Sequence, residues 1–112
     1  MKPIVTVDDF VKIEIRVGRV IEVEDFPGAQ KPLYKLKIDF GALGLKQSAA
    51  GLRPFYGKNE LMGRLVVAVI NFPPRQIANF YSECLVLGAI TDDGEVILLQ
   101  PDKEAPLGAN IA

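Results

Sequence analysis

The residue types that usually perform catalysis are scarce in this chain. It contains no histidine, so it lacks the commonest general base near neutral pH and the commonest metal ligand. Its one cysteine, Cys84, precedes Leu85, Val86 and Leu87, which predicts a buried and inert thiol. These residue types therefore favour a protein that binds over a protein that catalyses.

The acidic and glycine-rich segments have structural interpretations as well. Asp8–Asp9 and Asp92–Asp93 stand where a helix cap and a tight turn need carboxylates. Gly41 and Gly44 lack the spacing of a phosphate-binding loop. No group of side chains has metal-ligand spacing. We expect no enzyme activity, no metal and no cofactor.

The basic residues are concentrated in the middle of the chain. The formal net charge is -1, yet residues 31–75 carry +6, against -2 for residues 1–30 and -5 for residues 76–112. Such a block can give a near-neutral protein one basic face. Lys35 and Lys37 alternate along one predicted strand, and we expect Lys46 and Ser48 on the same face of the next strand. This face is either solvated surface or a stripe for phosphate groups.

Short segments of alternating hydrophobicity predict an all-β chain. The expected strands are residues 13–23, 33–40, 45–49, 64–72, 80–90 and 95–100, after a helical turn over residues 7–12. Gly18 predicts a bulge or bend in the first strand, and Asp92-Asp93-Gly94 predicts a hairpin turn. The core face of the second strand should carry Tyr34, Leu36, Ile38 and Phe40.

These strands fit one small barrel over residues 1–112, with a few extra short strands. No apolar run is long enough for a membrane span. Residues 1–10 resemble no secretory leader, and a lone cysteine forms no internal disulfide. We expect a cytoplasmic protein.

Three residues near the end of the long apolar strand are candidates for contact with a ligand. Phe72, before Pro73-Pro74, is either a core residue or a platform for a base or an apolar side chain. Asn71 either fixes a loop or contacts the ligand. Arg75 could pair with a phosphate or a peptide carbonyl, or simply lie on the surface. We expect Phe72, Lys35 and Lys46 to share one cleft.

Apolar residues at both chain ends predict an interface. Val7 and Phe10 near the start, and Leu107 and Ile111 near the end, are unsuitable for frayed termini. We expect them to form the two-fold contact of a homodimer.

Four stretches together resemble a known family. They are Ile15–Val20, Leu33–Gly41, Val69–Arg75 and Ser82-Glu83. In this order they resemble the tRNA-binding domain family, whose members have an OB-fold with a five-stranded barrel. Lys46–Ser48, Asn71–Arg75 and Leu98–Asp102 are similar to the CsaA-type secretion chaperones within that family.

The resemblance implies a cytoplasmic homodimer and adds Ser82 and Glu83 as groove residues. For the CsaA-type branch it implies binding of unfolded or precursor polypeptides for export; for the other relatives, non-specific tRNA binding. This chain has Ser82-Glu83-Cys84-Leu85 where tRNA binders carry methionine after Ser-Glu-Gly, and it has Asn79, which tolerates a left-handed backbone, in place of an earlier glycine. The change at the methionine favours the chaperone function, with tRNA binding as the alternative.

Overall fold

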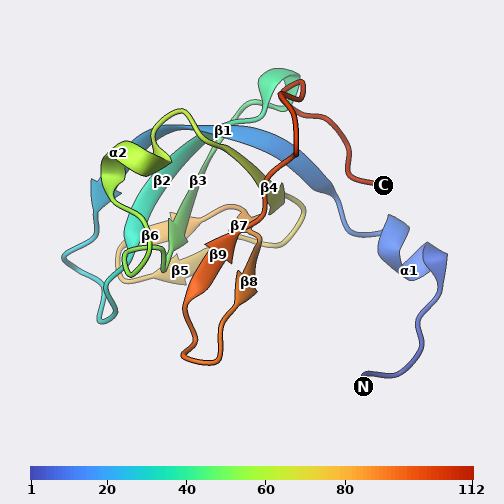
Figure 1. Ribbon diagram of the computed structural model, residues 1–112, viewed down its shortest axis with the longest axis horizontal. Helices are drawn as coiled ribbons and strands as arrows, with labels where there is room; N and C mark the ends of the chain where they lie inside the picture. Colours follow the sequence, from blue (N-terminus) through green and yellow to red (C-terminus); the bar gives the residue numbers. More distant parts are fainter.

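A computed structural model describes all 112 residues. Five antiparallel strands form a nearly closed barrel in the order β3-β2-β1-β4-β7 (Figure 1). They are β1 (Ile15–Asp25), β2 (Tyr34–Asp39), β3 (Leu45–Ala50), β4 (Leu65–Val69) and β7 (Leu85–Val86). Two hairpins lie outside this sheet: β5 (Arg75–Ile77) with β6 (Phe80–Ser82), and β8 (Gly88–Ile90) with β9 (Val96–Leu98). The predicted all-β, OB-like barrel is confirmed.

Three short helices complete the fold: α1 (Val7–Val11), the 3-10 turn η1 (Gly41–Leu43) and α2 (Lys58–Leu61). The predicted cap of α1 is present, since the Asp9 amide donates to Thr6 Oγ1 and the Thr6 amide donates to Asp9 Oδ2. No helix has the length and hydropathy required to cross a bilayer. Helix α1 stands apart from the barrel at the lower right of Figure 1.

Strand β1 runs through the barrel and pairs with β4 over its first half and with β2 over its second. The irregularity predicted at Gly18 lies between Val20 and Glu22 instead. Gly18 has a different role, because a Cβ there would lie 2.5 Å from Ile38 Cγ2 and 2.7 Å from Phe40 Cε1. The glycine thus allows two core side chains to lie against the strand backbone.

The core is formed mainly by β2 and β4. The predicted face of β2 is buried throughout, from Tyr34 to Phe40. Every residue of β4 is buried as well, as its unbroken apolar run predicts. Val66 and Ala68 face the main core, whereas Val67 and Val69 pack with Ile15 in a second cluster.

The segment predicted as one strand over residues 80–90 is divided among three strands. Strands β6, β7 and β8 pair with β5, β4 and β9 respectively, so the chain changes partner twice within eleven residues. The predicted Asp92-Asp93-Gly94 turn is confirmed, and Gly94 has a φ of 80°. At the β5–β6 turn the positive φ falls on Ala78 (54°), not on Asn79.

The carboxyl-terminal tail is held by backbone hydrogen bonds. The Gly108 amide donates to the Val17 carbonyl at 2.8 Å, and the Ile111 amide donates to the Ile15 carbonyl at 3.0 Å. Ile111 also packs against the second apolar cluster. Leu107 and Ile111 are therefore half-buried against their own chain, whereas Val7 and Phe10 are exposed.

Candidate binding site

The register of β2 and β3 places Lys46 and Ser48 on the inner face of the sheet. Lys46 lies opposite Ile38, and Ser48 lies opposite Leu36, which are both core residues. Residues directly opposite in an antiparallel pair share a face. The expectation that Lys46 and Ser48 lie beside Lys35 and Lys37 is therefore wrong. Ser48 is buried and donates to the Cys84 carbonyl at 2.9 Å, so it connects β3 to the chain before β7.

Lys35 and Lys37 lie on the outer face, where each has an acidic partner. Lys35 Nζ lies 3.7 Å from Glu24 Oε2, and Lys37 Nζ lies 3.4 Å from Glu22 Oε2. Lys35 Nζ also lies over two rings, 5.5 Å from the centroid of Phe26 and 5.8 Å from that of Phe80. On the outer face, these two lysines are therefore paired with acidic residues and do not form a continuous basic surface.

Asn71 fixes the loop that leads from α1 into β1. Its Oδ1 accepts from the Glu14 amide at 2.9 Å, and its Nδ2 donates to the Lys12 carbonyl at 2.8 Å. Of the two roles that the sequence leaves open, the structure shows the loop-fixing one. Asn71 therefore determines where the chain leaves the barrel for the exposed amino-terminal helix.

Ser82 and Glu83 close the open edge of the barrel at β3, and we call this contact the seam of the barrel. Glu83 Oε1 accepts from the Gln47 amide at 3.0 Å, and the Glu83 amide donates to the Gln47 carbonyl at 2.8 Å. Ser82 Oγ accepts from the Ala49 amide at 3.2 Å. Unpaired amides on an edge strand invite other chains to pair, and here side chains satisfy two of them.

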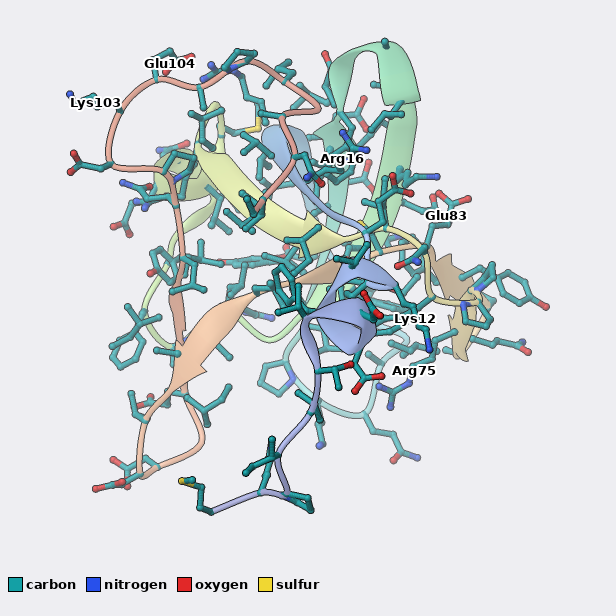
Figure 2. The ribbon with its side chains drawn as sticks, turned by 90° about the vertical axis from the view of Figure 1, so that its right-hand side faces the viewer. Lys12, Arg16, Arg75, Glu83, Lys103 and Glu104 are labelled. Atoms are coloured by element: carbon teal, nitrogen blue, oxygen red, sulfur yellow. The ribbon has the colours of Figure 1, made fainter.

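A cavity of about 340 Å³, which we call the seam cavity, lies next to the seam, between the barrel and the β5–β6 hairpin. Phe72 lines it and is 49% exposed, so Phe72 is not a core residue. The cavity is also lined by Pro73, Arg75, Ile77, Glu83 and Leu85. The lining is therefore largely apolar, with one exposed cation, Arg75, which Figure 2 shows with Glu83 on the same side of the molecule.

Four of the predicted site residues come together in this seam cavity: Phe72, Arg75, Ser82 and Glu83. Lys35 and Lys37 line a separate polar cleft with Glu22, Glu24 and Phe80. Lys46 lines neither the seam cavity nor the polar cleft. The expected single cleft of Phe72, Lys35 and Lys46 is therefore wrong.

Sequence reasoning missed Ile77 as a lining residue. It belongs to β5, whose three residues are too few to show a periodicity. The sequence signal for β5 is the Pro73-Pro74 pair after a buried strand, because such a pair ends the strand and turns the chain.

The cavity also contains Cys84 in its lining, as a neutral thiol. Burial raises the pKa of this thiol to about 11, although a hydrogen bond with Ser48 opposes the shift. A thiol with so high a pKa is a poor nucleophile. The structure brings no three histidine, cysteine or acidic side chains together as a metal site.

The sequence of this barrel matches the model of a known family. Residues 15–110 match the family model described as "Putative tRNA binding domain", and the chain belongs to that family.

Solved structures of close similarity are the CsaA chaperones. The CsaA chaperone protein from Picrophilus torridus is 56% identical over 97% of this chain and all of its own, with a TM-score of 0.89. Chaperone CsaA from Bacillus anthracis is 44% identical over 98% of this chain and all of its own, with a TM-score of 0.94. A methionyl-tRNA synthetase-related protein from Pyrococcus horikoshii is 30% identical over 99% of this chain and all of its own, with a TM-score of 0.88.

Curated relatives include much longer proteins. The methionine–tRNA ligases of Pyrococcus abyssi and Thermococcus onnurineus are 46% and 44% identical to this chain over 105 residues. These alignments cover 93% of this chain and 14% of each ligase. The chain therefore spans about a seventh of the length of these relatives.

Proposed function

We propose that this chain is a non-catalytic, CsaA-like chaperone module that binds unfolded or precursor polypeptides. One observation carries the proposal: an aromatic side chain, Phe72, stands half-exposed at a mostly apolar cavity. Exposed apolar cavities with a few polar groups are typical of binding sites. Unfolded chains differ from folded ones chiefly in presenting apolar side chains, and such a cavity selects for them.

The charges of the sheet favour a polypeptide over a nucleic acid. Binding to a phosphate backbone needs several free cations along one surface. Lys35 and Lys37, the two lysines predicted for that role, are paired with Glu24 and Glu22. In the seam cavity Arg75 is the one basic side chain.

The experiment that tests this function is binding of a permanently unfolded protein, such as a reduced and alkylated reporter, followed by fluorescence anisotropy. Phe72→Ala should weaken binding about tenfold, since a buried aromatic contact contributes on the order of 1–3 kcal/mol. Tyr81→Ala is the matched control, because Tyr81 is 53% exposed and lies outside the cavity lining. Equal affinity of the Phe72→Ala variant and the unsubstituted protein would contradict the proposal.

Non-specific tRNA binding is the second candidate, and the family match over residues 15–110 supports it. The affinity for tRNA should then fall steeply between 50 and 300 mM salt, whereas polypeptide binding should change little. If the lysines of β2 contact phosphates, Lys35→Ala with Lys37→Ala should flatten that salt dependence. An unchanged slope would remove these lysines from the tRNA contact.

The proposal includes a homodimer and a cytoplasmic location. The exposed Val7 and Phe10 of α1 support a two-fold contact, with Leu107 and Ile111 of the tail as its other side. The free thiol of Cys84 and the CsaA-like fold are consistent with a reducing compartment.

A further inference from the structure

The seam cavity adjoins two further cavities, one on each side. A second cavity of about 280 Å³ shares Ala49 and Leu85 with it, and a third of about 410 Å³ shares Arg75 and Ile77. Because each neighbouring pair shares lining residues, the three cavities adjoin one another with the seam cavity in the middle, and together they are called the groove. Strand β5 forms the boundary between the seam cavity and the third cavity.

The two ends of this groove have opposite chemistry. The second cavity is lined by small and apolar residues alone, among them Leu52, Leu87 and Ile90. The third cavity contains two cations, Lys31 and Arg75, and no acidic residue. Neither cation is part of an ion pair within the chain. Charge is therefore available at one end and excluded at the other.

We propose that the groove recognises an extended polypeptide segment that has a run of apolar residues and acidic groups next to that run. The acidic groups can lie on its amino-terminal or its carboxyl-terminal side. Apolar side chains would occupy the second cavity and the seam cavity, and carboxylates would pair with Arg75 and Lys31. The acidic groups can be glutamate or aspartate side chains or a terminal carboxylate. This inference rests on the proposed polypeptide-binding function and states which polypeptides are preferred.

The same groove is a poor match for an RNA strand. A phosphate backbone carries charge at every nucleotide, and binding grooves for single strands follow that backbone with positive charge along their length. Here the two unpaired cations lie at one end, while the other end has no polar side chain. A polypeptide can segregate its charges in this way, and a nucleic acid cannot.

The test uses four labelled peptides of equal length and measures their affinities by anisotropy in 50 mM salt. One has an apolar run followed by three glutamates; two others replace the glutamates by glutamines or by lysines. The fourth has the composition of the first, with glutamates placed between the apolar residues. The segregated glutamate peptide should bind on the order of tenfold more tightly than the glutamine and interspersed peptides. The lysine peptide should bind more weakly still.

Charge reversal identifies the residues responsible. Lys31→Glu with Arg75→Glu should invert the preference, so that the lysine peptide binds more tightly than the glutamate peptide. Lys103→Glu is the matched control and should leave the preference unchanged, because Lys103 is exposed and lies outside the groove on the loop labelled at the upper left of Figure 2. Circular dichroism of each variant checks that the barrel remains folded.

The outcomes separate this inference from the function on which it rests. If the unsubstituted protein binds all four peptides equally, and Phe72→Ala weakens each, the polypeptide function stands and the charge preference is overturned. If it binds tRNA but none of the peptides, both fail. If the preference exists but survives charge reversal, the groove is not its source and the inference is overturned.

Discussion

Glu83 and Gln47 join the barrel across its seam through two hydrogen bonds. The Glu83 carboxylate accepts from the Gln47 amide at 3.0 Å, and the Glu83 amide donates to the Gln47 carbonyl at 2.8 Å. Glu83 alone thus bonds the Gln47 amide and carbonyl of β3, which a neighbouring strand would otherwise do. The seam cavity lies directly beside this contact, since Glu83 is among its lining residues.

Replacing Glu83 should loosen the seam in a graded way. Glu83→Ala should lower the free energy of unfolding by about 1–2 kcal/mol, because the Gln47 amide loses its acceptor. Glu83→Gln keeps an oxygen in the same place and should cost less than half as much. Urea unfolding followed by circular dichroism measures both. Equal losses for the two variants would mean that the carboxylate charge, not the acceptor, is what matters.

Gly18 should be irreplaceable for steric reasons. A Cβ at this position would lie 2.5 Å from Ile38 Cγ2 and 2.7 Å from a ring carbon of Phe40. Gly18→Ala should therefore destabilise the barrel by about 1–3 kcal/mol. Gly28→Ala is the control, because its nearest neighbour to a Cβ is a ring carbon of Phe26 at 3.6 Å. The control should stay within about 0.5 kcal/mol of the unsubstituted protein, and an equally stable Gly18→Ala would refute the steric argument.

The parts of the fold that the sequence predicts well are those with strong periodicity. Strand β2 alternates between core and surface residues, and β4 is apolar throughout, so both appear with the predicted burial. Strand β3 lacks this signal: its apolar Leu45 is exposed, while its polar Ser48 is buried. The faces of Lys46 and Ser48 depend on the register with β2, which hydrophobicity alone could not supply.

The candidate site was harder to predict because short, irregular segments build it. The position of Phe72 and Arg75 around Pro73-Pro74 indicates these two residues, and the family resemblance indicates Ser82 and Glu83. The cavity that unites them depends on the β5–β6 hairpin, whose strands have three residues each. The pairing of Lys35 with Glu24 was likewise hidden, since these residues are eleven positions apart and meet only through strand register.

The exposed apolar residues of α1 should hold two copies together. Val7 is 77% exposed and Phe10 is 41% exposed, and α1 has no buried residue. Size-exclusion chromatography with light scattering should give twice the monomer mass at micromolar concentration. Val7→Glu with Phe10→Glu should shift that mass towards the monomer, because burying two charges in an apolar contact is costly. A monomer mass for the unsubstituted protein would exclude the dimer.

Cys84 should give the stability of the protein a specific pH dependence. Burial raises the pKa of its thiol from its ordinary value of 9.0 to about 11, so the folded state holds this proton more tightly than the unfolded state. The resulting stabilisation is complete below about pH 9 and is lost as the pH rises towards 11, because the unfolded chain releases its proton first. At pH 8 the folded protein should also react with iodoacetamide on the order of tenfold more slowly than the urea-unfolded chain, because its thiolate fraction is smaller and the greater nucleophilicity of a high-pKa thiolate offsets only part of that difference. Lysines and tyrosines titrate in the same range, so Cys84→Ala is the control: its free energy of unfolding should fall less steeply between pH 9 and 11. Parallel pH profiles for the two proteins, or alkylation at similar rates in the folded and unfolded states, would show that the thiol is not protected in this way.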